Sequence, residues 1–190
     1  MLGLMHPTLS LELFTLFVVL TGAERVHELV VSTRNARWAF DRGGVETNRG
    51  QMPWMISLHV GLLLGALGEA WLLDRPFLPL LGWPMLVIAL ACQGGRLWVM
   101  RSLGNQWNTR LIVVPGLPLV TAGPYRWTRL PHPNYLIVAI EGIALPLVHT
   151  AWITAVAFTV LNAVLLIAFR IPAEDRALSG AARIGTGVHT

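Results

Sequence analysis

Two short runs, about two thirds of the way along this 190-residue sequence, combine aromatic, cationic and imidazole side chains in a pattern that suits a charged ligand. The runs are Gly123-Pro124-Tyr125-Arg126 and His132-Pro133-Asn134-Tyr135. A guanidinium such as that of Arg126 can hold a carboxylate or phosphate by two parallel hydrogen bonds, and it suits anionic lipid headgroups as well. Proline is favoured in the first turn of a helix, so a helix beginning at Pro133 would place His132 and Tyr135 at its N-terminal end.

Acidic side chains follow at positions where a helix would hide them from water. Glu141 lies seven residues after Asn134, so both would share one helical face, about 10 Å apart along the axis. A carboxylate at that depth is neutral, paired or functional, and we expect Glu141 to contact a ligand. Arg170 and Glu174 flank Pro172, which breaks or kinks a helix. A carboxylate beside a broken helix end could bind a cationic or hydroxyl-bearing ligand.

Charged residues also interrupt the apolar first half of the sequence. Glu24, Arg25 and Glu28 are spaced so that they can meet on adjoining faces of one helix. They would form either an ion cluster that packs against other helices or a contact to substrate or cofactor. His59 and Glu69 would lie about 15 Å apart along a helix, too far to bind one ion together. We expect a buried interhelical hydrogen bond for each.

The chain that positions these residues is too apolar for a soluble protein. Hydrophobic residues make up 54% of it and charged residues 13%, about half the charge density of an ordinary soluble domain. This composition predicts an all-α integral membrane protein and excludes intrinsic disorder and a disulfide scaffold. Apolar stretches of about 20 residues predict spans over 9–31, 53–73 and 77–99. The stretch 136–169 predicts a hairpin of two short helices, with Thr150 as the N-cap of the second.

The arginines between these five predicted spans indicate an orientation. Ten of the eleven arginines in the connections and the tail would lie on one side, with the polar segments 32–52, 100–133 and 170–190. The positive-inside rule places that side in the cytoplasm, with the N-terminus outside and the C-terminus inside. The net charge of +4 therefore marks cytoplasmic loops and does not indicate a nucleic-acid partner.

The segment 101–131 contains four prolines, together with Gly116 and Gly123, that forbid a long helix. It predicts an irregular interfacial connection with Trp107 at the membrane surface. No P-loop, G-x-G-x-x-G, H-E-x-x-H or G-x-S-x-G motif occurs in the sequence. A lone Cys92 forms neither an internal disulfide nor a zinc site. Any cofactor must then bind between membrane helices and their cytoplasmic connections. We treat residues 1–190 as a single membrane domain, with a three-helix part (1–99) followed by residues 100–190.

These motifs together resemble the isoprenylcysteine carboxyl methyltransferase family over about residues 96–178. The matching motifs are Gly123-Pro124-Tyr125-Arg126, His132-Pro133-Asn134-Tyr135 and Arg170…Glu174-Asp175, preceded by Arg101, Leu103-Gly104 and Trp107. The first half is similar to a bacterial branch of this family through Arg25, Glu28, Asn35, Arg37, Met55, His59 and Glu69. That branch is associated with O-methylation of long-chain polyketides such as alkylpyrones and alkylresorcinols, which implies a bacterial inner membrane.

The resemblance implies a methyltransferase that binds S-adenosylmethionine in a cytoplasmic pocket formed by residues 100–190. The expected cofactor contacts are Gly123, Pro124, Tyr125, His132, Pro133, Tyr135 and Glu174. The expected catalytic residues are Arg170, which the resemblance places by the reacting group, with Arg126 and Glu141. The expected substrate contacts are Glu28, Trp107 and Asn134.

A lipophilic acceptor would enter sideways from the bilayer, among the membrane lipids. A carboxylate acceptor is already ionised and needs no base, whereas a resorcinol, with a pKa near 10, would need one such as Glu141 or Glu28. The alternatives are a phospholipid N-methyltransferase, a membrane reductase that uses a nicotinamide cofactor, and a small transporter. A transporter predicts inverted repeats and broken helices at the midplane, and the sequence shows neither.

Overall fold

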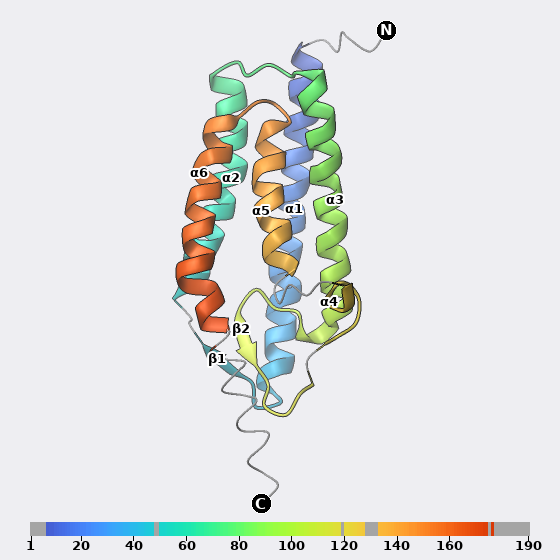
Figure 1. Cartoon of the computed structure of the whole chain (residues 1–190), viewed down its shortest axis with the longest axis vertical. Coiled ribbons are helices and arrows are strands. Elements are labelled where there is room, and N and C mark those ends of the chain that lie inside the picture. The colour runs from blue at the N-terminus through green and yellow to red at the C-terminus, as the bar shows by residue number, and fades with distance from the viewer. Residues whose placement is uncertain (1–6, 48–49, 119, 128–132, 175, 177–190) are drawn as a thin grey trace, which may run out of the picture.

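The computed structural model describes residues 7–47, 50–118, 120–127, 133–174 and 176, except for the side chains of Pro7 and Trp127. Within these residues the fold is a bundle of long helices with a small two-stranded sheet at one end (Figure 1). The helices are α1 (Pro7–Phe40), α2 (Gln51–Leu72), α3 (Pro79–Leu103), α4 (Pro124–Trp127), α5 (Pro133–Leu147) and α6 (Trp152–Val164). The shorter elements are β1 (Val45–Thr47), η1 (Gly104–Gln106), β2 (Leu111–Val113) and the π-helical η2 (Leu165–Arg170).

Three helical segments are long and apolar enough to cross a membrane. They are α2, α3 continued through η1 (Pro79–Gln106) and α6 continued through η2 (Trp152–Glu174), while α5 is a shorter apolar helix. Large apolar side chains cover the outside of the bundle, as Leu80 at 96% and Leu72 at 82% exposure illustrate. Helices that are apolar on their outer faces belong in lipid. The prediction of an all-α integral membrane protein is therefore confirmed.

The bounds of α2 and α3 lie within four residues of the predicted spans, whereas α1 continues well past its predicted end. The span predicted over 9–31 continues as a helix to Phe40. Polar residues of this extension are buried against the connection after α3. The Ser32 hydroxyl bonds to Asn108 Oδ1 at 2.7 Å, and Asn35 Nδ2 donates to the Trp107 carbonyl at 2.7 Å. Tertiary hydrogen bonds thus extend a helix that hydropathy alone would end nine residues earlier.

The predicted hairpin is formed by α5 and α6, but the predicted N-cap is wrong. Thr150 has a φ of +52° and donates its hydroxyl to the Pro76 carbonyl at 2.9 Å, so it cannot cap α6. Glu69 of α2 takes that role: its carboxylate accepts the backbone N–H of Ile153 at 3.1 Å and of Thr154 at 2.7 Å. A carboxylate at a helix N-terminus satisfies N–H groups that the helix itself leaves open. The expected interhelical hydrogen bond of Glu69 is confirmed.

His59 makes a different contact from the one expected. Its Nδ1 bonds to the Met55 carbonyl of its own helix at 2.8 Å. Its ring packs edge-on against Phe158 of α6, with centroids 5.8 Å apart. The contact between α2 and α6 at this level is therefore aromatic, and the prediction of an interhelical hydrogen bond for His59 is wrong among the described residues.

The loops that carry most of the arginines gather at one end of the bundle (Figure 1). The β1–β2 pair, α4 and the end of η2 lie there, while the α2–α3 and α5–α6 connections lie at the opposite end with the start of α1. Strands β1 and β2 pair antiparallel, with Glu46 opposite Ile112. The segment expected to be irregular therefore contains one short strand, held by a partner more than 60 residues earlier. We call this end of the molecule the loop end.

Pro172 neither ends nor breaks the last helix. The six residues of η2 widen into a π-helical pattern, and the helix then continues through Pro172 to Glu174. A proline lacks the N–H that an α-helix would use, and single-turn π segments accommodate such a local mismatch. Glu174 therefore lies on a continuous helix, one turn beyond Arg170.

Candidate functional site

A cavity of about 750 Å³ lies between the helices toward the loop end. Its volume falls in the range typical of small-molecule and cofactor sites. Helices α1, α2, α3, α5 and α6 contribute to its walls, as does the connection between α3 and α4. Most of the lining is apolar, and two groups of interacting polar residues contribute to it, one near the loops and one deeper between the helices.

The group near the loops joins Tyr135, Arg170 and Glu174, and we call it the tyrosine triad. The Tyr135 hydroxyl donates a short hydrogen bond to Glu174 Oε2, and Arg170 Nε donates to the Tyr135 oxygen at 3.0 Å. Arg170 Nη2 also donates to the Thr109 carbonyl at 3.0 Å, which ties the end of α6 to the connection before β2. The triad thus brings together three residues that the sequence separates by up to 39 positions.

Tyr125 of α4 lines the cavity beside this triad. Burial raises the pKa of the Tyr125 phenol to about 12, and the negative charge of Glu174 acts in the same direction. The phenol is therefore protonated at neutral pH. It presents a hydroxyl donor and an aromatic face at the loop end of the cavity.

The deeper group is a buried ion network of Arg25, Glu28, Gln93, Arg96 and Glu141. Arg96 binds Glu28 through two hydrogen bonds of 2.8 and 2.5 Å, and Arg25 bonds to Glu28 and to Glu141 at 2.6 Å each. Gln93 donates to Glu141 at 2.8 Å. The network connects α1, α3 and α5, so the alternative of an ion cluster that packs against other helices is the one the structure shows. Glu28, Arg25 and Arg96 also line the cavity.

Seven of the thirteen residues expected as catalytic, cofactor or substrate contacts line this one cavity. They are Glu28, Trp107, Tyr125, Asn134, Tyr135, Arg170 and Glu174. Gly123, Pro124, Arg126, Pro133 and Glu141 lie in the adjoining elements and are not part of its lining. Arg126 is exposed on α4, whereas Glu141 is buried in the ion network. His132 lies outside the residues that the structure describes.

Gly123 positions the loop that carries Tyr125. Its φ is +63°, a conformation that side chains with a Cβ rarely adopt, and a Cβ there would meet Ser102 Oγ at 2.0 Å. Gly123→Ala should therefore displace Tyr125 and weaken binding of S-adenosylhomocysteine by at least tenfold, measured by calorimetry. Gly94→Ala is the matched control, because a Cβ at Gly94 meets no described atom within 4 Å. Equal affinities for the two variants would contradict a role for Gly123.

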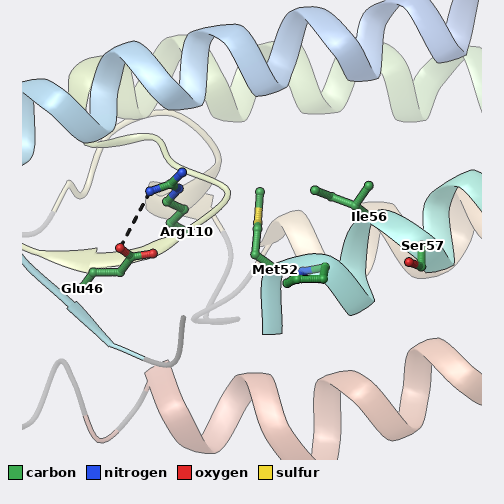
Figure 2. Close-up of a pocket in the computed structure, with 6 residues that line it drawn as sticks. Glu46, Met52, Ile56, Ser57 and Arg110 are labelled. Atoms are coloured by element: carbon green, nitrogen blue, oxygen red, sulfur yellow. Dashed lines mark ion pairs between the residues drawn. The ribbon is translucent and has the colours of Figure 1, made fainter. Parts of the chain in front are cut away.

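A second hollow of about 610 Å³ adjoins the first at the start of α2. Figure 2 shows Arg110 and Glu46 on one side of it and Met52, Ile56 and Ser57 on the other. Arg110 and Glu46 form an ion pair of 3.8 Å across the β1–β2 pair. Met52, Ile56 and Arg110 line both hollows, so the main cavity continues toward the surface between α2 and β2.

The sequence interpretation missed Asn162 and gave no role to Arg96. Asn162 is 4% exposed and lines the cavity from α6. The available signal was an amide within the otherwise apolar run 160–169. Arg96 lies near the end of the predicted span 77–99, but nothing in a single sequence indicates that its partner is Glu28, 68 residues away.

The chain is similar to known proteins over most of its length. Residues 85–180 match the model of the isoprenylcysteine carboxyl methyltransferase (ICMT) family, a stretch that includes the tyrosine triad, α4 and Arg96. Over 167 residues the chain is 35% identical to the "Uncharacterized protein YpbQ" of Bacillus subtilis (strain 168). This alignment covers 87% of this chain and 96% of that relative. No solved structure matches the chain. The family match over half of the sequence and the long alignment to a bacterial relative lead to one conclusion: the chain belongs to the isoprenylcysteine carboxyl methyltransferase family.

Proposed function

We propose that this membrane methyltransferase transfers a methyl group from S-adenosylmethionine to an oxygen of a lipophilic acceptor. The family consists of membrane methyltransferases that use this cofactor in general. The observation that carries the proposal is a single cavity with the tyrosine triad and Tyr125 at its loop end and mainly apolar walls elsewhere. Such a cavity can hold a polar methyl donor and a lipophilic acceptor at the same time.

The residues at the loop end fit S-adenosylmethionine by their chemistry. Glu174 offers a carboxylate for an ammonium group or ribose hydroxyls, and Arg170 offers a guanidinium for a carboxylate. Tyr125 adds an aromatic face and a protonated hydroxyl. When bound, the cofactor supplies a methyl group on a positively charged sulfur. The role of the protein is to align the acceptor oxygen about 3 Å from that methyl group and to exclude water.

The acceptor would reach the cavity from the bilayer. Val26 of α1 and Val60 of α2 line the cavity, and their side chains are 62% and 47% exposed. The hollow shared with Met52 and Ile56 adds a second apolar approach near the loop end. An acceptor with a long hydrocarbon chain could therefore keep its chain in lipid while its head enters the site. The arginine-rich loop end would face the cytoplasm of a bacterial cell, where S-adenosylmethionine is dissolved.

The buried carboxylates bear on which oxygen can be methylated. The oxygens of Glu28 and Glu141 are bonded to Arg25 and Arg96, so a proton taken up by either carboxylate would disrupt an ion pair. A carboxylate or an acidic enol acceptor needs no strong base and suits such a site directly. We propose an oxygen of this kind, on a prenylcysteine or on a long-chain alkyl polyketide, as the methyl acceptor.

The proposal is tested by methyl transfer in reconstituted vesicles. The purified protein is supplied with methyl-labelled S-adenosylmethionine and with farnesylcysteine, an alkylpyrone, an alkylresorcinol or phosphatidylethanolamine in parallel. We expect label in at least one of the three oxygen acceptors. Label in phosphatidylethanolamine alone would replace the proposal with a phospholipid N-methyltransferase.

A further inference from the structure

Two polar side chains in the deep part of the cavity have hydrogen-bonding atoms that the protein leaves open. Asn162 is 4% exposed, and its side-chain amide has no hydrogen-bond partner among the described residues. His59 uses Nδ1 for the Met55 carbonyl, and its Nε2 has no partner in the described part of the chain. Both residues line the same cavity. A side-chain amide that lines a cavity of a membrane protein and binds no described protein group still needs a hydrogen-bond partner, and a ligand in the cavity can supply one.

The two side chains belong to the same seam of the bundle. The His59 ring packs edge-on against Phe158, with centroids 5.8 Å apart, and Asn162 lies one helical turn beyond Phe158. Asn162 therefore lies closer to the loop end than the point on α6 that the His59 ring contacts. No hydrogen bond joins His59 and Asn162 in the described structure. Their open hydrogen-bonding atoms are therefore not used to join α2 to α6.

The charges around these residues indicate what kind of head group would fit. Arg25 and Arg96 line this region, and each is bonded to a carboxylate of the ion network. Glu28 and Glu141 balance the charge of these two guanidiniums, so among the described residues neither arginine offers an unmatched charge to an anion, although Arg96 Nη1 makes no hydrogen bond. An amide both donates and accepts hydrogen bonds, and an imidazole nitrogen does one or the other. A head group with uncharged hydroxyl and carbonyl oxygens complements this set better than a carboxylate or an ammonium does.

We infer that Asn162 and His59 form a subsite that binds uncharged hydroxyl or carbonyl oxygens of a long-chain ligand. This inference rests on the proposed function in one respect, because it takes the occupant to be the methyl acceptor. Of the two acceptors proposed above, it favours the enol of a long-chain alkyl polyketide over the carboxylate of a prenylcysteine. The subsite fixes how deep the ligand enters, while the apolar walls from Val26, Val60 and Leu63 contact its chain. Neither residue is required to hold the methyl donor, whose expected contacts lie at the tyrosine triad.

The test measures binding of three probes with the same chain length to the protein in lipid nanodiscs, with empty nanodiscs subtracted. The probes are 4-dodecylresorcinol, laurate and dodecyltrimethylammonium. We expect 4-dodecylresorcinol to bind at least tenfold more tightly than the two charged probes. Asn162→Leu and His59→Phe should each weaken its binding at least tenfold, and each should bind S-adenosylhomocysteine within twofold of the wild-type affinity.

Thr159→Val is the matched control on α6, because the Thr159 hydroxyl bonds to the Ala155 carbonyl and the residue does not line the cavity. If Asn162→Leu fails to fold, binding of the same probes to Asn162→Ser is measured in its place. Unchanged binding of 4-dodecylresorcinol in both variants, or tighter binding of laurate, would overturn the subsite. If the wild type fails to bind S-adenosylhomocysteine but shows binding of 4-dodecylresorcinol that depends on Asn162, the subsite stands and the proposed function falls.

Discussion

Replacing Glu174 by glutamine is expected to lower methyl transfer at least a hundredfold and to weaken S-adenosylhomocysteine binding by a comparable factor. The substitution removes the negative charge of Glu174 at the loop end of the cavity and replaces the charged acceptor of the Tyr135 hydroxyl by a neutral amide. A hydrogen bond to a charged group contributes about 1.5–3 kcal/mol, so the loss of one such bond to the cofactor, together with misplacement of Tyr135, gives an effect of this size. Binding is measured by calorimetry and transfer with the labelled methyl donor.

Glu12→Gln makes the same chemical change on an exposed part of α1 and should leave both quantities unaltered. His132→Ala, at a position outside the described residues, should lower methyl transfer as Glu174→Gln does, and both variants should still insert into the membrane. Full activity of either variant would refute the assignment of that residue to the cofactor pocket.

Replacing Glu28 by glutamine should destabilise the fold by about 3–5 kcal/mol, the cost of removing one partner of a buried ion pair. Glu28 is 3% exposed, and its carboxylate binds Arg96 twice and Arg25 once. The change leaves two buried guanidiniums with only the Glu141 carboxylate as an ionised partner in the network. Unfolding in detergent, followed by circular dichroism against denaturant concentration, measures the loss.

The same Glu12→Gln variant serves as the control here, and a change of less than about 0.5 kcal/mol is expected for it. Replacing both partners, as in Glu28→Leu with Arg96→Met, should recover much of the stability, because Arg25 and Glu141 still pair with each other at 2.6 Å. A single variant as stable as wild type would contradict the structural role of the ion network.

Hydropathy was sufficient to predict the middle helices of the bundle, because their outer faces are apolar and lie in lipid. It ended α1 too early, since Ser32 and Asn35 are held in the helix by partners more than 70 residues away. It also chose Thr150 as a cap on local grounds, whereas Glu69 caps α6 from another helix. Both errors arise where a distant side chain, and not the local sequence, satisfies a backbone or polar group.

The site shows the same division between local and distant information. Motif resemblance was enough to single out Tyr135, Arg170 and Glu174, which the structure brings into direct contact. The pairing of Arg25 with Glu141 joins residues 116 positions apart, and a single sequence contains no signal for such a partner. Asn162 was overlooked because an isolated amide in an apolar helix acquires meaning only when the cavity that it faces is known.

The central claim is that the cavity at the tyrosine triad binds the methyl donor, and calorimetric titration of S-adenosylhomocysteine into the purified protein tests it most directly. The account predicts saturable binding at one site per chain, weakened about a hundredfold or more in Glu174→Gln and unchanged in Glu12→Gln. Failure of the correctly folded wild-type protein to bind S-adenosylhomocysteine, or equal affinity in wild type and Glu174→Gln, would contradict it.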